Sequence, residues 1–201
     1  MPAGDWRNYV RGVAWALQDA GHRVAGADLA ITGDVPQGAG LSSSAAIEVA
    51  VAGALAAISG LAIDPRALAL LAQRAENEFA GVQCGIMDQF ASALSREDWA
   101  LLLDCRSLDT EAVPLPAGDD VAIVVVDSRV PRTLGKTPYN RRREECSEAA
   151  RLLGVESLRD ANQEMLDAAQ ADLPEHLYRR VRHVVTENGR VLDAVEALRR
   201  G

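Results

Sequence analysis

The chain has 201 residues, 48% of them hydrophobic and 25% charged, a balance typical of a soluble globular protein with one domain or two small ones. Its 21 Lys and Arg against 29 Asp and Glu give a net charge of -8, which disfavours binding to nucleic acids or anionic membranes. No apolar run reaches the ~18 residues of a membrane span, and the first residues lack the pattern of a signal peptide. The 3 cysteines are far apart and odd in number, which argues against a disulfide framework or a zinc site. These features predict a cytoplasmic protein.

Hydrophobic periodicity predicts helices interspersed with strands along the whole chain. Helices are expected over 6–20, 45–58, 65–79 and 86–94, from Tyr139 onwards, and from about Pro174 to the end. The stretch 45–58 is apolar on nearly every face, which predicts a buried helix. The last helix has an apolar stripe of Leu177, Val181, Val184, Val185, Val191, Leu192, Val195 and Leu198, weakened in the middle by Asn188-Gly189.

Strands are expected over 28–32, 100–104 and 121–126. The last of these is apolar throughout, as a buried central strand would be. The sequence therefore predicts an α+β protein with a single mixed sheet.

The stretch 36–46, with the sequence PQGAGLSSSAA, is the most informative in the chain. Gly38 and Gly40 allow a positive φ, so that successive N–H groups can point into one concavity. The serines follow at the start of a helix, where free N–H groups favour an anion. The stretch is neither a Walker A motif, because the Lys is missing, nor a G-x-G-x-x-G fingerprint. From spacing alone, a flexible turn with serine caps is as good an interpretation as a phosphate-binding loop.

This string resembles the phosphate-binding signature of the GHMP small-molecule kinases, which include galactokinase, homoserine kinase, mevalonate kinase and phosphomevalonate kinase. The resemblance implies that the ATP phosphates contact Pro36, Gln37, Gly38, Ala39, Gly40, Leu41, Ser42, Ser43 and Ser44. It also implies a two-lobed α+β fold, incomplete here, with a mixed sheet and packed helices. Residues 1–105 would be the rest of the N-terminal lobe and residues 106–201 the start of the C-terminal lobe.

Two carboxylates follow the serine turn, Glu76 in a predicted helix and Asp88 at the start of the next one. An Asp flanked by Ile86, Met87 and Phe90 is unusual on a solvated face. It can be a helix cap, a buried ion-pair partner, or a catalytic carboxylate beside a phosphate loop. The stretch 76–89, ENEFAGVQCGIMDQ, resembles that of the galactokinases. This resemblance implies that Asp88 is the base facing the sugar C1 hydroxyl and that Glu76 is an Mg²⁺ ligand together with Ser44, with Ser42 and Ser43 as alternatives.

The stretch 139–146, YNRRREEC, resembles the Y-N-x-R-R-x-E-C run of the same family, which implies that Tyr139 binds the sugar. The alternative for Tyr139 is an aromatic helix staple. The run Arg141–Arg143 is interpreted as a solvated face with local Glu partners. Cys84 and Met87 are interpreted as packing residues.

Two further galactokinase signatures, G-R-V-N-L-I-G-E-H-x-D-Y and a C-terminal T-G-[AG]-G-x-G-G, do not occur in this chain. We therefore expect an internal piece of a galactokinase that alone turns over no galactose, since an absent transition-state cation can cost ~10³ in rate. The expected activity of the intact protein is transfer of the γ-phosphate of MgATP to the C1 hydroxyl of α-D-galactose. Alternatives are a kinase of N-acetylgalactosamine or arabinose, and a non-catalytic sugar sensor. ATP and Mg²⁺ are the implied cofactors, and the intact protein is expected to be a monomer.

Overall fold

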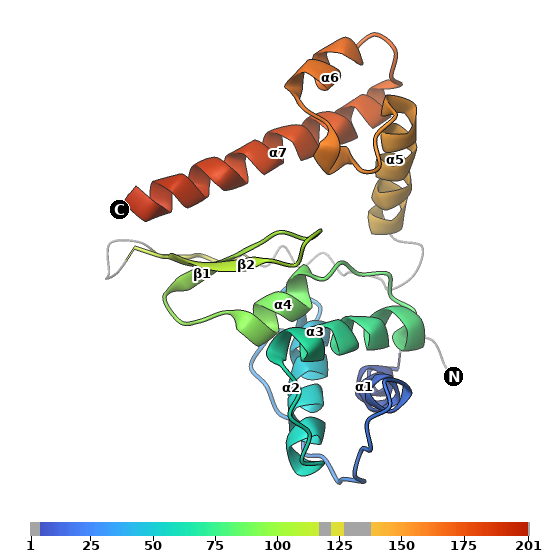
Figure 1. Ribbon diagram of the computed structural model, residues 1–201, viewed down its shortest axis with the longest axis vertical. Helices are drawn as coiled ribbons and strands as arrows, with labels where there is room; N and C mark the ends of the chain where they lie inside the picture. The colour runs from blue at the N-terminus through green and yellow to red at the C-terminus, as the bar shows by residue number, and fades with distance from the viewer. Residues whose placement is uncertain (1–4, 117–121, 127–137, 201) are drawn as a thin grey trace. The chain divides into compact units, whose positions relative to one another are not determined.

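The computed structural model describes residues 5–116, 122–126 and 138–200, with the backbone alone for 138–140. The chain divides into two compact units, Met1–Leu134 and Gly135–Gly201. The predicted α+β class is confirmed, because helices and an antiparallel sheet both occur (Figure 1).

The first unit is a group of helices followed by a hairpin. Its helices are α1 (Arg7–Asp19), α2 (Ser43–Ile58), α3 (Pro65–Arg74), the π-helix η1 (Ala75–Ala80) and α4 (Met87–Leu94). The start of α3 follows from its sequence: the Asp64 carboxylate accepts a hydrogen bond from the Arg66 N–H at 2.8 Å, and Pro65 occupies the first helical position. The predicted helix 65–79 does form, but its last turn widens into η1. Wide turns of this type are frequent at functional sites.

The main core of this unit lies between α1, α2 and η1. Val13, Ala16 and Leu17 of α1 meet a buried set from the other two elements, Val51, Ala52, Leu55 and Ala75. A second cluster packs Ala69 of α3 against Ile86 and Phe90. The prediction that the second helix is buried all round was wrong in part. Ala50, Ala54, Ala57 and Ile58 are exposed, so only one face of α2 contributes to the core.

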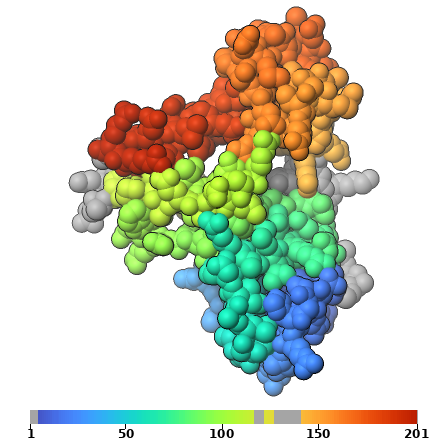
Figure 2. All heavy atoms as spheres, viewed as in Figure 1, coloured from blue at the N-terminus to red at the C-terminus, as the bar shows by residue number. Residues whose placement is uncertain are grey.

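A glycine allows α1 to approach η1 closely. A Cβ atom at Gly12 would lie 3.2 Å from the Ala75 carbonyl oxygen and 3.2 Å from the Cβ of Phe79. In Figure 2 the blue atoms of α1 lie directly against the green atoms of this segment. Trp15 packs beside this contact. Its ring centroid lies 5.8 Å from that of Phe79, and the Arg74 guanidinium lies 4.8 Å from the centroid of the Trp15 ring.

The hairpin consists of β1 (Trp99–Leu103) and β2 (Thr110–Pro114), paired antiparallel with Leu101 opposite Ala112. The predicted strand 100–104 is thus confirmed within one residue, and β2 is a strand that the sequence analysis missed. Leu101 and Leu103 pack on the cluster around Phe90. The sheet of the described residues is therefore antiparallel rather than mixed.

Two predicted strands do not form in the described residues. Residues 28–32 have no regular structure, and Leu29 and Ile31 are 41% and 45% exposed. Residues 122–126 also have no regular structure, and Val126 is 83% exposed; Val121 lies outside the described residues. The apolar pattern predicted strands, but a strand needs a neighbour to satisfy its N–H and C=O groups. Neither stretch pairs with a strand in the part of the chain that the structure describes.

The second unit contains α5 (Pro138–Leu153), the short 3₁₀ helix η2 (Leu158–Asp160), α6 (Gln163–Ala168) and α7 (Glu175–Arg200). Figure 1 shows α5 and α6 against the first half of α7. Leu177 and Val181 are fully buried there, as the predicted stripe requires, whereas Val191 and Leu192 are 44% and 60% exposed. Asn188-Gly189 does not interrupt α7. Within the described ranges, the search for a helix long and apolar enough to cross a membrane found none.

Candidate functional site

The serine turn has the backbone geometry that an anion-binding loop needs. Gly38 and Gly40 have φ angles of 74° and 81°, and Ser42 adopts a left-handed conformation with φ 55° and ψ 44° directly before α2. A non-glycine residue in this region is strained by about 1 kcal/mol or more and often marks a functional site. No side chain caps the start of α2. The first N–H groups of this helix have no intrahelical partner and are available to an anion.

A buried polar cluster lies between α2, η1 and α4. The Gln89 Nε2 atom donates hydrogen bonds to Glu76 Oε2 at 2.7 Å and to Glu48 Oε2 at 3.3 Å. Glu48 and Gln89 are fully buried and Glu76 is 4% exposed. The cluster therefore joins one carboxyl group from α2 and one from η1 through a single amide of α4.

Cys84 is the fourth member of this cluster. Its thiol donates to Glu76 Oε2 at 3.2 Å. Asn77 holds the backbone of Cys84 against η1, because its Oδ1 atom accepts from the Cys84 N–H at 2.8 Å and its Nδ2 atom donates to the Cys84 carbonyl at 3.4 Å. Cys84 is thus a polar partner of Glu76 as well as a packing residue. The packing role predicted for Met87 was wrong, since its side chain is 64% exposed.

Burial controls the protonation of the cluster. Removal from water, followed by the nearby Glu76 carboxylate, raises the pKa of Glu48 to about 9. The same two causes, in the same order, raise the pKa of the Cys84 thiol to about 12. Burial and the charges of Glu76 and Glu48 also raise the pKa of Tyr9 on α1. Glu48 is therefore neutral at physiological pH, and the cluster can contain two carboxyl groups without two adjacent buried charges.

One serine of the turn shares a face of α2 with a member of the cluster. Ser44 precedes Glu48 by four residues on α2, and residues four apart lie on the same face of a helix. Glu48 in turn shares Gln89 with Glu76. Ser44 therefore lies one turn from Glu48 on the same face of α2, whereas Ser43 is rotated from Ser44 by about 100° around the helix axis.

Asp88 stands at the start of α4, next to the buried Gln89. Its side chain is half-buried, and the residue that caps α4 is Ile86, without a side-chain hydrogen bond. Within the described ranges no hydrogen bond or ion pair involves the Asp88 carboxylate. Asp88 is therefore not the N-cap of α4, and the described residues supply no ion-pair partner for it.

The donor atoms at this site suit magnesium. A carboxylate and a hydroxyl are hard oxygen ligands, and Mg²⁺ commonly takes one or two protein oxygens and completes its shell with phosphate and water. The described residues contain no group of three or more His, Cys, Asp and Glu side chains that could hold a metal.

The remaining predicted residues lie in the second unit. Tyr139 belongs to the first turn of α5, and its side chain is outside what the structure describes. Arg141 pairs with Glu145 at 2.9 Å, which agrees with the interpretation of this run as a face with local Glu partners. Glu145 also binds Arg180 of α7 at 2.7 Å. The hydrogen bond from Arg180 is the main cause that lowers the pKa of Glu145, and the hydrogen bond from Arg141 lowers it further.

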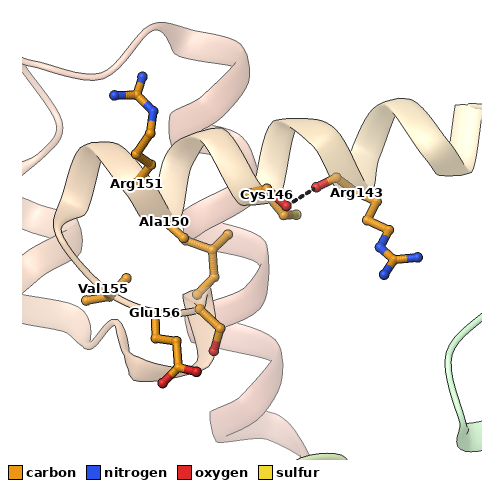
Figure 3. Close-up of a pocket in the computed structure, with 9 residues that line it drawn as sticks. Arg143, Cys146, Ala150, Arg151, Val155 and Glu156 are labelled. Carbon is orange, nitrogen blue, oxygen red and sulfur yellow. Dashed lines mark hydrogen bonds between the residues drawn. The ribbon is translucent and has the colours of Figure 1, made fainter.

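A pocket of about 400 Å³ lies beside α5 and η2, lined among others by Arg143, Arg151 and Glu156 (Figure 3). None of the predicted site residues lines it. Sequence reasoning missed Glu48 and Gln89, which connect the predicted residues of the first unit. The available signal was a lone Glu in the apolar stretch 45–58, where an unpaired charge would be costly.

The model of the GHMP kinases N terminal domain matches residues 8–96, which include the serine turn and the whole cluster. The chain is also similar to galactokinases, so the resemblance expected from the sequence is confirmed. It is 54% identical to a galactokinase of Roseiflexus sp. (strain RS-1), over 98% of this chain and 51% of that protein. The crystal structure of Lactococcus lactis galactokinase complexed with galactose matches with a TM-score of 0.86 and 33% identity, over 98% of this chain and 52% of that one. The chain spans about half the length of both relatives.

Proposed function

We propose that the intact protein is a galactokinase, which transfers the γ-phosphate of ATP to the C1 hydroxyl of α-D-galactose. The observation that carries this proposal is the arrangement around Gln89. The amide connects the helix that follows the serine turn with the Glu76 carboxylate, and its neighbour in sequence is Asp88, whose carboxylate has no partner among the described residues. The similarity to two galactokinases, one of them crystallised with galactose, favours this sugar among possible acceptors.

Each predicted residue has a defined task in this proposal. The loop 36–44 binds the triphosphate, because its glycines and the start of α2 present N–H groups to an anion. Ser44 and Glu76 hold Mg²⁺, which supplies positive charge to the phosphates when bound. Tyr139 binds the sugar. In the same proposal, residues 1–105 belong to the N-terminal lobe and residues 106–201 form the start of the C-terminal lobe.

Asp88 is the base of the transfer step. As the C1 oxygen of galactose forms its bond to the γ-phosphorus, a carboxylate oxygen of Asp88 accepts the hydroxyl proton. The bond between the γ-phosphorus and the β,γ-bridging oxygen breaks, and ADP leaves with that oxygen. A carboxylate without another partner is available for this proton, which agrees with the surroundings of Asp88 in the described residues.

The test compares Asp88→Asn with the wild type in the intact protein. We expect kcat with galactose to fall by about 10²-fold or more, while the Kd of ATP changes by less than about twofold. Asp28→Asn, an identical change at an exposed position, is the control and should keep wild-type kinetics. A kcat of Asp88→Asn close to that of the wild type would show that this residue is not the base.

Substrate identity is tested on the same wild-type protein with a panel of sugars. Galactose is expected to have the highest kcat/KM. Higher values with N-acetylgalactosamine or arabinose would assign the site to a different sugar-1-kinase. Binding of galactose and ATP without turnover of any sugar would instead indicate a sensor.

A further inference from the structure

Gln89 occupies the point where three helical segments of the first unit meet. Its backbone belongs to α4, its Nε2 atom binds Glu76 of η1 and Glu48 of α2, and the Cys84 sulfur lies 3.6 Å from the same nitrogen. The side chain is fully buried. A buried amide is costly unless it is hydrogen-bonded, and here Nε2 makes all the contacts while Oε1 has no partner among the described residues. The contacts of Nε2 therefore fix the orientation of the amide.

The chemistry of a glutamine suits this position. Its NH₂ group offers two N–H donors, one for each carboxyl group. A glutamate here would bring a third carboxyl group to the cluster, and an apolar side chain would remove the 2.7 Å hydrogen bond to the buried Glu76 oxygen. A neutral amide with two donors can bind both carboxyl groups at once.

The position also couples the three motifs of the proposed site. Toward α2, the bond to Glu48 ends one helical turn from Ser44. Toward η1, the bond to Glu76 fixes the carboxylate that is assigned to the metal. Along α4, Gln89 is adjacent to Asp88, so anchoring its side chain anchors the first turn that carries the base.

We propose that Gln89 is a positioning residue of this site: with the Cys84 thiol as a second donor, its buried amide holds the Glu76 carboxylate toward the serine turn and keeps Asp88 in register with it. The proposal rests on the proposed function, because it assigns Gln89 a task only if Glu76 binds a metal. Carboxylates that ligate metals are themselves hydrogen-bonded as a rule, and loss of such a partner lowers metal affinity by about 10- to 100-fold.

The test measures metal binding directly in the intact protein. Mn²⁺ serves as the probe, and its affinity for the protein–ADP complex is measured by electron paramagnetic resonance. We expect Gln89→Met, which keeps the length of the side chain and removes the amide, to weaken Mn²⁺ binding by about 10-fold or more. The affinity for ADP without metal should stay unchanged. Gln18→Met, the same change at an exposed position of α1, is the control.

Kinetics separate positioning from general damage. In Gln89→Met the Mg²⁺ concentration for half-maximal activity should rise, and saturating Mg²⁺ should restore much of kcat. Cys84→Ala removes the other donor to the same Glu76 oxygen and should weaken Mn²⁺ binding several-fold; it decides the question if Gln89→Met does not fold.

The outcomes separate this proposal from the proposed function. Wild-type Mn²⁺ affinity in both variants would overturn the role of Gln89 and leave the proposed function intact. A wild-type ADP complex that binds no Mn²⁺ would overturn the metal site of the proposed function and this proposal with it.

Discussion

Glu48 makes the stability of this protein depend on pH. Its pKa is about 9 in the folded chain against 4.5 for an unperturbed glutamate, first because of burial and then because of the neighbouring Glu76. Between these two values the folded protein keeps a proton that the unfolded chain has already lost. Stability is therefore lost as the pH rises through this window, because unfolding is favoured by proton release.

The magnitude follows from the same linkage. One proton contributes about 1.4 kcal/mol per pH unit, so Glu48 is expected to lower the free energy of unfolding by up to about 3 kcal/mol between pH 6 and pH 8. Glu48→Gln has a similar shape and no proton to lose, and its amide oxygen can accept the bond from Gln89. Relative to the wild type, this variant should therefore become progressively more stable as the pH increases.

The assay is urea unfolding of the intact protein at pH 6, 7 and 8, followed by tryptophan fluorescence. Glu97→Gln, the same substitution at an exposed position, should reproduce the pH dependence of the wild type. Parallel profiles for Glu48→Gln and the wild type would refute the reasoning, because they would mean that Glu48 has the same pKa in both states.

Two further predictions concern packing and reactivity. Gly12→Ala should be less stable than Gly53→Ala by about 1–3 kcal/mol in urea unfolding, because a Cβ at Gly12 meets the Ala75 carbonyl oxygen at 3.2 Å while Gly53 has nothing within 4 Å; equal stabilities would contradict the close approach of α1 to η1. Iodoacetamide at pH 8 should modify Cys105, which is exposed, much faster than Cys84, whose pKa is raised to about 12 by burial and by Glu76. Peptide mass spectrometry measures the modification rates of both cysteines, and a faster rate at Cys84 than at Cys105 would contradict the place of Cys84 in the cluster.

Local signals in the sequence were sufficient for most helices. The N-cap and proline at Asp64-Pro65, the glycines before α2 and the apolar spacing of α1 each predicted an element that the structure contains. These signals act between residues a few positions apart, and their physics is the same in any surroundings. The stretches 28–32 and 122–126 show the limit of such reasoning. An apolar run shows that a strand is possible, but hydrogen bonds to a neighbouring strand decide whether it forms.

From the sequence alone came the predictions of a phosphate loop and of two functional carboxylates, and the resemblance to the galactokinases, because motif and spacing are properties of the chain. Only the tertiary structure showed that Glu48, Glu76, Cys84 and Gln89 form one cluster, from positions up to 41 residues apart. The burial of Glu48 and its closeness to Glu76, which raise its pKa to about 9, are also tertiary. The physical reason is that burial and the distance between charges depend on how α2, η1 and α4 pack against one another, and no local sequence pattern encodes that packing.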